Sequence, residues 1–348
     1  MVMFQVNGSI GYFHVSSCNF KKKKKIDIHN FQIPLDLRED QILIKIKYAG
    51  ICGSQIMEYF GKRGKDSYLP HCFGHEAVGK VKAIGKSVNK VKIGDDVILS
   101  WIKGKGLDFG GFTLCDTQNK KINFGPLSTF SSYVIACENR VFLKPYKMNF
   151  LEAVLYGCAV QTGAGIVLNE LKQIKRNNKI CLIGTGGIGM STLLTLLKKK
   201  IKICVIENNK HKMNFLKKFK VNLLPSNFEL KKYYNYFDFC IETSGSAKMI
   251  EKSLNLIHSN GVVVFASHPA NRDKIKISPF DLIQGKKIYG SWGGSCKPDR
   301  DIKKIFKFFN YKNVFYKNIK IKKYKLNRLP LAFKDILNGR VHRAVITF

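Results

Sequence analysis

Hydrophobic residues alternate with polar ones along the first part of the chain and predict strands. Residues 42–48, Ile-Leu-Ile-Lys-Ile-Lys-Tyr, alternate at their end and lead as a strand into Ala-Gly-Ile-Cys. Residues 78–98 contain short β-type runs that are broken by Gly79, Gly85 and Gly94. Residues 102–130 are rich in Gly, Lys and Asn with weak periodicity, which predicts an extended lobe or loop. This pattern is typical of a strand-rich, partly closed sheet.

From Asn149 onward the spacing of apolar residues changes. Asn149, with Glu152 three residues later, resembles the capping arrangement at a helix N-terminus. Residues 189–200 place three leucines on one helical stripe. Short apolar segments predict strands at residues 180–183, 201–206, 237–241 and 261–265.

Strands that alternate with helices imply a parallel sheet covered on both faces, so the fold class is α/β with a doubly wound second domain. A chain of 348 residues is too long for one core and suits two domains. Residues 293–348 return to mixed character and are expected to rejoin the first domain. We therefore expect one domain at residues 1–158 and 293–348 and a dinucleotide-binding domain at residues 159–292.

Composition favours an ordinary globular protein. Hydrophobic residues make up 45% of the chain, and no apolar stretch approaches the roughly 18 residues that a membrane helix needs. The N-terminal sequence has neither a basic leader nor a continuous apolar segment of the secretory kind, so we expect a cytoplasmic protein with no membrane partner. Ten cysteines without a secretory signal favour thiols and metal ligands over disulfides, and no CxxC pair occurs.

The formal net charge of +36 could indicate a nucleic-acid partner. The lysines, however, are scattered over every segment, and no nucleic-acid-binding motif accompanies them, so we expect no such partner. The run Lys21–Lys25 is the one dense block and is best explained as a solvated turn or as protection of an edge strand. The surplus charge would also attract anionic small molecules, including a dinucleotide cofactor.

A glycine-rich turn follows the apolar strand at residues 180–183 and has the pattern GxGxxG. Gly184 allows a tight turn, Gly186 lets the backbone approach a pyrophosphate, and Gly189 lets the next helix pack close to the strand. The free amides at the helix N-terminus then face the phosphate charge. The residues expected to bind the cofactor in this turn are Gly184, Gly186, Gly187, Ile188 and Gly189.

An acidic residue, Glu207, ends the next predicted strand, twenty-three residues after Gly184. A carboxylate at this place accepts hydrogen bonds from the adenosine ribose and repels a 2′-phosphate, which favours NAD over NADP. Because a charged hydrogen bond is worth roughly 1.5–3 kcal/mol, we expect a preference of about tenfold or more. Lys210, His211 and Lys212 follow directly and would offset part of the repulsion.

Three further segments carry a family resemblance. They are Gly50-Ile51-Cys52-Gly53-Ser54, Phe73-Gly74-His75-Glu76-Ala77-Val78-Gly79 and Tyr156-Gly157-Cys158-Ala159-Val160-Gln161-Thr162-Gly163. In order and approximate spacing they resemble the motifs GxCxSD, GHE and GCxxxTG of the zinc-dependent medium-chain alcohol dehydrogenases. The similarity runs from about residue 35 to the C-terminus. It implies a GroES-like catalytic domain beside a Rossmann domain, and a homodimer or homotetramer.

The resemblance also implies a metal site and a reaction. Cys52, His75 and Cys158 would be the three ligands of a catalytic zinc, with Glu76 close behind it as an alternate ligand. Ser54 would begin the proton relay from an alcohol, which transfers hydride to NAD. Two assignments rest on alignment: Arg343 resembles the family's C-terminal pyrophosphate-binding arginine, and Trp101 resembles a wall of the substrate pocket. Each has a structural alternative, a surface arginine and a lobe-packing aromatic.

The chain departs from the family's pattern at three places. The Asp that follows the Ser of GxCxSD, and that holds the zinc-binding histidine in relatives, is Gln55 here. The His that many relatives have five residues after the first cysteine is Met57, which cannot titrate. Residues 95–130 contain only Cys115, so the four-cysteine structural zinc lobe of many members cannot form. We therefore expect one zinc per chain.

Two other classes remain open at this point. A zinc-free, NADP-dependent quinone or enoyl reductase relative would lack the set of two cysteines and a histidine. A non-catalytic, nucleic-acid-binding relative would bind DNA or RNA tightly and with strong salt dependence. The alcohol, a simple one or a polyol or sugar, is not determined by these motifs.

Overall fold

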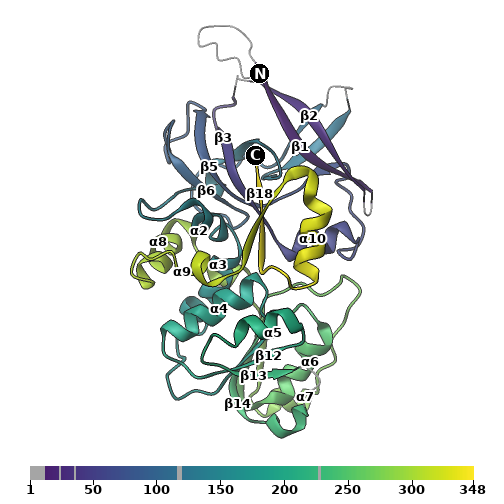
Figure 1. Cartoon of the computed structure of the whole chain (residues 1–348), viewed down its shortest axis with the longest axis vertical. Coiled ribbons are helices and arrows are strands. Elements are labelled where there is room, and N and C mark those ends of the chain that lie inside the picture. The colour runs from purple at the N-terminus through teal and green to yellow at the C-terminus, as the bar shows by residue number, and fades with distance from the viewer. Residues whose placement is uncertain (1–11, 23–24, 35–36, 116–119, 226–228) are drawn as a thin grey trace.

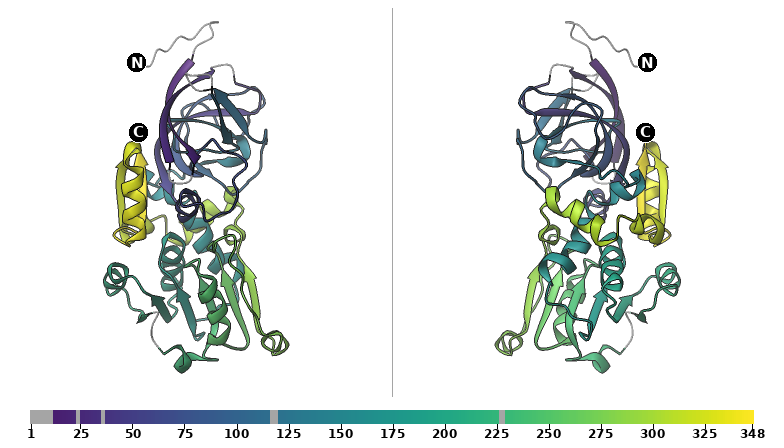
Figure 2. Two further views of the ribbon diagram at one scale, coloured as in Figure 1. Left: turned by 90° about the vertical axis from the view of Figure 1, so that its right-hand side faces the viewer. Right: turned by 90° about the vertical axis from the view of Figure 1, so that its left-hand side faces the viewer.

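The chain folds around three β-sheets, which Figure 1 shows in the computed structural model. The structure describes residues 12–22, 25–34, 37–115, 120–225 and 229–348. Two sheets lie in the upper half of Figure 1, coloured purple to blue, and the third lies in the lower half, in teal and green. The chain end, in yellow, returns to the upper half, and Figure 2 shows the same division from both sides.

A five-stranded sheet contains the first two described strands. Its order is β2 (Lys25–Pro34), β1 (Tyr12–Lys22), β4 (His71–Cys72), β8 (Lys121–Gly125) and β7 (Phe112–Cys115). In the β1–β2 hairpin Lys22 pairs with Lys25, while residues 23–24 of the predicted turn lie outside the described residues. Strands β7 and β8 fall within residues 102–130, so the expectation of a lobe or loop is wrong for these two segments. Both segments are short, Phe-Thr-Leu-Cys and Lys-Ile-Asn-Phe-Gly, and they pair with each other, while β8 also pairs with β4.

A seven-stranded sheet forms the frame of the site. Its order is β10 (Val141–Leu143), β6 (Asp96–Ser100), β5 (Glu76–Ile84), β3 (Gln41–Ile51), β18 (Arg343–Thr347) and β17 (Ile321–Lys325), and β9 (Tyr133–Cys137) also pairs with β3. The last strand, β18, pairs antiparallel with β3, so the C-terminal segment joins the first part of the chain as expected. Alternate residues of β3, including Ile44 and Ile46, pack into the core of this sheet.

The third sheet is parallel and has six strands. Its order is β13 (Asn222–Pro225), β12 (Ile203–Glu207), β11 (Ile180–Ile183), β14 (Phe237–Glu242), β15 (Ile257–Phe265) and β16 (Lys287–Gly290). The four strands predicted here are confirmed, with β12 and β15 beginning two residues later and four residues earlier than predicted. The strand order reverses between β11 and β14, where open α/β sheets bind ligands at the carboxyl ends of their strands.

Helices cover both faces of the parallel sheet. Ile180 and Leu182 of β11 pack in one core cluster with Leu193 of helix α4 (Gly187–Lys198). Cys181 and Ile183 point the other way, into a second cluster with the leucines of helix α6 (Ala247–Leu256). The α/β fold of a GroES-like part and a Rossmann sheet is therefore confirmed, and α4 begins two residues before the predicted helix. The residue limits of the two domains stay a prediction.

Further helices connect and flank these sheets. The α-helices are α1 (Gly53–Tyr59), α2 (Phe150–Leu155), α3 (Ala159–Gly165), α5 (Lys210–Leu216), α7 (Pro279–Ile283), α8 (Pro298–Phe308), α9 (Val314–Asn318) and α10 (Leu329–Leu337). Single-turn elements are η1 (Glu138–Arg140), the π-helical η2 (Ile166–Glu170), η3 (Leu230–Tyr233), η4 (Gly293–Ser295) and η5 (Leu326–Arg328).

The start of α2 shows how a predicted cap is used. The Asn149 side chain accepts the backbone N–H of Glu152 at 2.6 Å, so the N-cap is confirmed. The return bond of a capping box is missing, because the Glu152 carboxylate accepts the amides of Phe315 and Tyr316 instead. Glu152 therefore ties α2 to the start of α9, more than 160 residues later.

Candidate metal and dinucleotide site

Four side chains that are far apart in the sequence meet at one point. Cys52 follows β3, His75 and Glu76 stand at the start of β5, and Cys158 lies between α2 and α3. Their ligand atoms all lie within 4.8 Å of one another. The structure thus brings together all four residues of the sequence-predicted metal site.

The two thiols are spaced for a shared ligand. The Sγ atoms of Cys52 and Cys158 are 3.9 Å apart, far beyond the roughly 2 Å of a disulfide. Two thiolates on one tetrahedral zinc, each about 2.3 Å from it, would have their sulfurs about 3.8 Å apart. The observed separation therefore suits a common metal ion without movement of either cysteine.

Two motif glycines make room for Glu76. A Cβ atom at Gly50 would lie 2.6 Å from Cδ of Glu76, and a Cβ at Gly157 would lie 2.6 Å from its Cβ. The glycine before each cysteine is thus needed because the buried Glu76 packs against both turns. This contact explains locally why Gly stands two residues before Cys52 and directly before Cys158.

The two thiols influence each other's ionisation. The hydrogen bond from Cys158 lowers the pKa of the Cys52 thiol well below its usual value, against the effect of burial and with help from His75 and Arg343. The same bond, together with burial, raises the pKa of Cys158. Burial would lower the pKa of His75, but the Cys52 thiolate raises it. A dication replaces such protons on binding, because thiolate and neutral imidazole are the forms that ligate metals.

Several buried polar atoms around the cluster lack partners. Within the part of the chain that the structure describes, Nε2 of His75, Oε2 of Glu76 and Oγ of Ser54 accept or donate no hydrogen bond. Buried polar groups are rarely left in this state without a reason. The other ring nitrogen of His75 has a partner, because Nδ1 lies 2.5 Å from the amide nitrogen of Gln55. The orphaned atoms are those that a metal and an alcohol would use.

Arg343 links this cluster to the glycine turn. Its guanidinium forms a buried ion pair with Glu76, and burial, which disfavours the charge, is outweighed by Glu76 and the two thiols, so that the pKa of Arg343 is raised. A Cβ on Gly187 would lie 2.7 Å from Cδ of Arg343, so the arginine lies directly against the turn. The alternative of a surface arginine is wrong, since Arg343 is 3% exposed.

The glycine turn has the geometry that its sequence predicts. Gly184 has a φ of 81°, in the left-handed region that favours glycine. A Cβ at Gly189 would lie 2.2 Å from the carbonyl oxygen of Gly184, so only glycine permits this approach of α4 to the strand end. A Cβ at Gly186 would meet no protein atom within 4 Å, which leaves open space in front of the turn. Gly186 caps α4 without a side-chain bond, so the first amides of the helix stay available.

Glu207 ends β12, as predicted, but its carboxylate is already engaged. It accepts hydrogen bonds from the amide and the hydroxyl of Thr185 and from the amides of Asn208 and Asn209, at 2.6–3.0 Å. Burial opposes ionisation, but Lys212, whose Nζ lies 4.0 Å away, and these hydrogen bonds lower the pKa of Glu207. The residue is therefore a fixed negative charge at the end of the strand, partly balanced by Lys212.

One cavity of about 670 Å³ joins these parts. Cys52, Ser54 and Met57 line it, and so does the glycine turn. Glu207 and Arg343 lie along the same cavity, together with His342. Cys52, one of the predicted metal ligands, therefore faces the same space as the predicted cofactor residues other than Gly189, at the reversal point of the sheet order.

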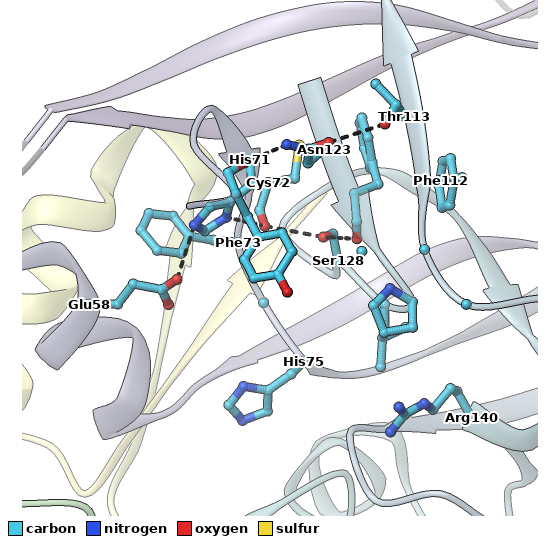
Figure 3. Close-up of a pocket in the computed structure, with 18 of the residues that line it drawn as sticks. Glu58, His71, Cys72, Phe73, His75, Phe112, Thr113, Asn123, Ser128 and Arg140 are labelled. Carbon is cyan, nitrogen blue, oxygen red and sulfur yellow. Dashed lines mark hydrogen bonds and ion pairs between the residues drawn. The ribbon is translucent and has the colours of Figure 1, made fainter. Parts of the chain in front are cut away.

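A second cavity, of about 660 Å³, is lined by Gln55 and by His75, which Figure 3 shows among its lining residues. The metal-ligand cluster thus has one ligand facing each cavity. Trp101 lies edge-on to His75, with ring centroids 6.5 Å apart, and edge-on to Trp292 at 4.9 Å. Trp101 is not among the residues that line these two cavities, and it packs against a hydrophobic core cluster, so its assignment as a pocket wall stays a prediction.

Comparison with known proteins identifies the family. Residues 38–146 match the model of the alcohol dehydrogenase GroES-like domain, and residues 187–311 match that of the zinc-binding dehydrogenase domain. The chain belongs to the zinc-type medium-chain dehydrogenase family. It is an oxidoreductase of the alcohol dehydrogenase type within that family.

Similar proteins match the dehydrogenase along nearly its whole length. S-(hydroxymethyl)glutathione dehydrogenase of Komagataella pastoris is 24% identical over 361 residues, which cover 93% of this chain and 94% of that protein. Two solved structures share the fold at 20% identity, each covering 97% of this chain and 99% of the other: a zinc-binding alcohol dehydrogenase domain protein from Burkholderia ambifaria (TM-score 0.86) and benzyl alcohol dehydrogenase from Acinetobacter calcoaceticus (TM-score 0.83). In the described part of this dehydrogenase, no helix is both long and apolar enough to cross a membrane.

Sequence reasoning missed several residues around the second cavity of this dehydrogenase. Arg140 lines it, and so do His71, Glu58 and Asp66, whose side chains form a second group of close ligand-type atoms. None of them belongs to a motif, and Arg140 follows His75 by 65 positions without a recognisable spacing. The signal that was available, a buried run Glu-Asn-Arg after a strand, carries no chemistry until the fold places it.

Proposed function

We propose that this dehydrogenase catalyses the zinc-dependent reaction alcohol + NAD⁺ = aldehyde or ketone + NADH + H⁺. One observation carries the proposal: the donor atoms of Cys52, His75, Glu76 and Cys158 lie within 4.8 Å of one another, and Cys52 lines the cavity of the glycine turn. A metal held by these residues would lie beside the place where a nicotinamide can bind.

The residues present suit zinc. Two thiols and an imidazole are the ligand types that zinc prefers in catalytic sites, and the buried Nε2 of His75 lacks any other partner in the described structure. When bound, zinc would supply a Lewis acid that lowers the pKa of an alcohol hydroxyl. Glu76 keeps one carboxylate oxygen without a hydrogen-bond partner in the described part of the chain, and it would serve as the alternate ligand.

The protein's own groups perform the remaining tasks. The Ser54 hydroxyl, buried and unpartnered in the described part of the chain, would accept the alcohol proton and pass it on. Met57, which lines the same cavity, cannot carry that proton further, so water or a cofactor hydroxyl has to. The glycine turn and the α4 N-terminus would hold the pyrophosphate, and Arg343 would add its positive charge.

The cofactor preference in this proposal is NAD. Glu207 is an ionised group at the strand end, and a 2′-phosphate placed there would be repelled. The partner is a small alcohol or carbonyl compound, and the homodimer or homotetramer implied by the family is tested by light scattering. The proposal includes one zinc per chain, because residues 95–130 contain a single cysteine.

The decisive experiment combines elemental analysis with a screen of alcohols and aldehydes, followed by the absorbance of NADH. We expect one zinc per chain and turnover in the wild type. Cys52→Ala should lose both, with kcat/KM falling by roughly a thousandfold or more because an open-site metal is removed. Cys115→Ala, at an exposed cysteine, is the matched control and should keep both.

The same data separate the alternatives. Turnover at the wild-type rate in a metal-free Cys52→Ala protein would exclude zinc catalysis and favour a zinc-free reductase. Absence of hydride transfer together with tight, salt-sensitive DNA or RNA binding would favour the non-catalytic relative.

A further inference from the structure

A buried arginine faces the second cavity without a complete set of partners. Arg140 is 8% exposed and belongs to η1, which follows strand β9. Its Nη1 donates to the backbone carbonyl of Trp101, and its Nε donates to no group in the described part of the chain. Figure 3 shows its guanidinium pointing into the cavity that His75 also lines.

The carboxylates of this cavity are already paired with other cations. Asp108 lies 2.7 Å from Nζ of Lys103. Glu58 and Asp66 lie 3.1 and 2.8 Å from Nε2 of His71. Among the described residues, no carboxylate forms an ion pair with the Arg140 guanidinium within 4 Å, although the charge of Asp108 acts on it from farther away. The positive charge of Arg140 is therefore only partly balanced, and its guanidinium can still pair with a ligand.

The position of the Arg140 charge in a buried site is energetically unfavourable. Burial lowers the pKa of Arg140, but a guanidinium stays protonated in proteins. An unpaired buried charge is unfavourable, and a bound anion would relieve it with hydrogen bonds that are stronger than neutral ones. Arginine is suited to this task because its planar group binds carboxylate and phosphate in a bidentate manner.

The position of Arg140 relates the anion to the candidate reaction centre. Its guanidinium holds the carbonyl of Trp101, and the ring of Trp101 lies edge-on to the ligand His75. The cavity has a volume of about 660 Å³, within the range of small-molecule sites. A ligand that extends from His75, the member of the metal-ligand cluster that lines this cavity, to Arg140 therefore fits inside one cavity.

We propose that Arg140 binds a carboxylate or phosphate at the far end of the substrate, so that the substrate class is alcohols and aldehydes that carry an anionic group. This inference rests on the proposed function for the reaction itself. Arg140 acts as a specificity-determining residue that anchors the substrate, and it takes no part in proton or hydride transfer.

Matched substrates test the anchor. The zinc-loaded full chain with NAD⁺ is assayed on benzyl alcohol, 4-(hydroxymethyl)benzoate and 4-(hydroxymethyl)phenyl phosphate. We expect kcat/KM for at least one anionic substrate to exceed that for benzyl alcohol by about tenfold or more, mainly through KM. The carboxylate and phosphate arms show which anion the cavity takes.

Variants then assign the preference to one residue. Arg140→Gln should remove the tenfold preference and leave benzyl alcohol within about twofold, because only the anchor is lost. Arg140→Lys, which keeps the charge, should retain part of the preference. Arg176→Gln removes the same charge from an exposed position and should behave as the wild type. If Arg140→Gln does not fold, the anchor is tested by Arg140→Lys and by the kcat/KM values of the wild type for the neutral and the anionic substrates.

A binding measurement separates this inference from the proposed function. Calorimetric titration of 4-(hydroxymethyl)benzoate into the protein without NAD⁺ needs no turnover. Binding that depends on Arg140 without turnover of any alcohol would support the anchor and refute the reaction. Equal kcat/KM for the neutral substrate and both anionic ones, with no Arg140-dependent binding, would overturn the anchor while the reaction stands.

Discussion

The Gln55 side chain bridges the backbone of one candidate zinc ligand and the ring of another. Its amide oxygen accepts the N–H of Cys52 at 2.9 Å, and its amide nitrogen lies 2.5 Å from Nδ1 of His75. A histidine that ligates zinc through Nε2 carries its proton on Nδ1 and needs an acceptor there. Here the acceptor oxygen of the Gln55 amide faces Cys52, so the group that faces Nδ1 of His75 is the amide nitrogen, which is a donor.

We therefore expect Gln55→Asp to tighten zinc binding. A carboxylate has two acceptor oxygens, and its charge also favours the metal-bound imidazole, so the affinity should rise by about tenfold or more. Competition with a chelator of known zinc affinity measures this change. Gln173→Asp adds the same charge at an exposed position and should leave the affinity unchanged. Equal or weaker binding in Gln55→Asp would show that Gln55 does not limit the site.

Glu207 should control the choice of cofactor through its charge. Glu207→Gln keeps the size of the side chain and removes the repulsion of a 2′-phosphate. The ratio of kcat/KM for NAD to that for NADP should then fall by about tenfold. Glu229→Gln, at an exposed glutamate, is the control for net charge. An unchanged ratio would mean that Lys212 already cancels the charge of Glu207, since its Nζ lies 4.0 Å away.

Arg343 should bind the cofactor directly and not only through its ion pair with Glu76. Arg343→Gln should raise KM for NAD⁺ by about tenfold or more, with a smaller effect on kcat, because a charged contact to the pyrophosphate is lost. Glu76→Gln removes the ion pair but keeps the guanidinium, so KM should stay within about threefold. The exposed Arg328→Gln is the surface control. A similar rise of KM for NAD⁺ in Arg343→Gln and Glu76→Gln would assign the effect to the ion pair between the two residues.

The local motifs of the site could be predicted from sequence because each has a backbone requirement. Gly184 needs a positive φ, and Gly189 needs a close approach to the strand, so both glycines stand at fixed offsets. Cys52, His75 and Cys158 are predicted from the resemblance to three motifs of the family, and the structure adds that Gly50 and Gly157 make room for Glu76.

Contacts between distant segments could not be predicted. Glu152 accepts the amides of residues more than 160 positions later, which no cap motif indicates. The hydrogen bonds of Glu207 to Thr185 depend on the register of two parallel strands. Arg140 acquires its environment only when β9 pairs with β3 and places η1 at the cavity. Such positions are set by tertiary pairing and leave no periodic signal.

His71 should make stability depend on pH. Its Nε2 lies 2.8 Å from Asp66 and 3.1 Å from Glu58, while Nδ1 lies 3.0 Å from the carbonyl of Cys72. Burial would lower the pKa of His71, but these partners raise it to about 9. Because this value exceeds the roughly 6.5 of an unfolded histidine, the stabilisation is complete below about pH 6.5 and is lost as the pH rises through 9.

The corresponding experiment compares urea unfolding of the wild type and His71→Gln at pH 6, 8 and 10. The difference in unfolding free energy should be largest at pH 6, at most about 3 kcal/mol, and should shrink towards pH 10. Subtraction of the two proteins removes the titration of lysines and cysteines that they share. His211→Gln, at an exposed histidine, should give a small difference that does not vary with pH. If the difference in unfolding free energy between the wild type and His71→Gln does not change with pH, the His71 ring is neutral beside the two carboxylates. Only a protonated ring is stabilised by these carboxylates as the pH falls.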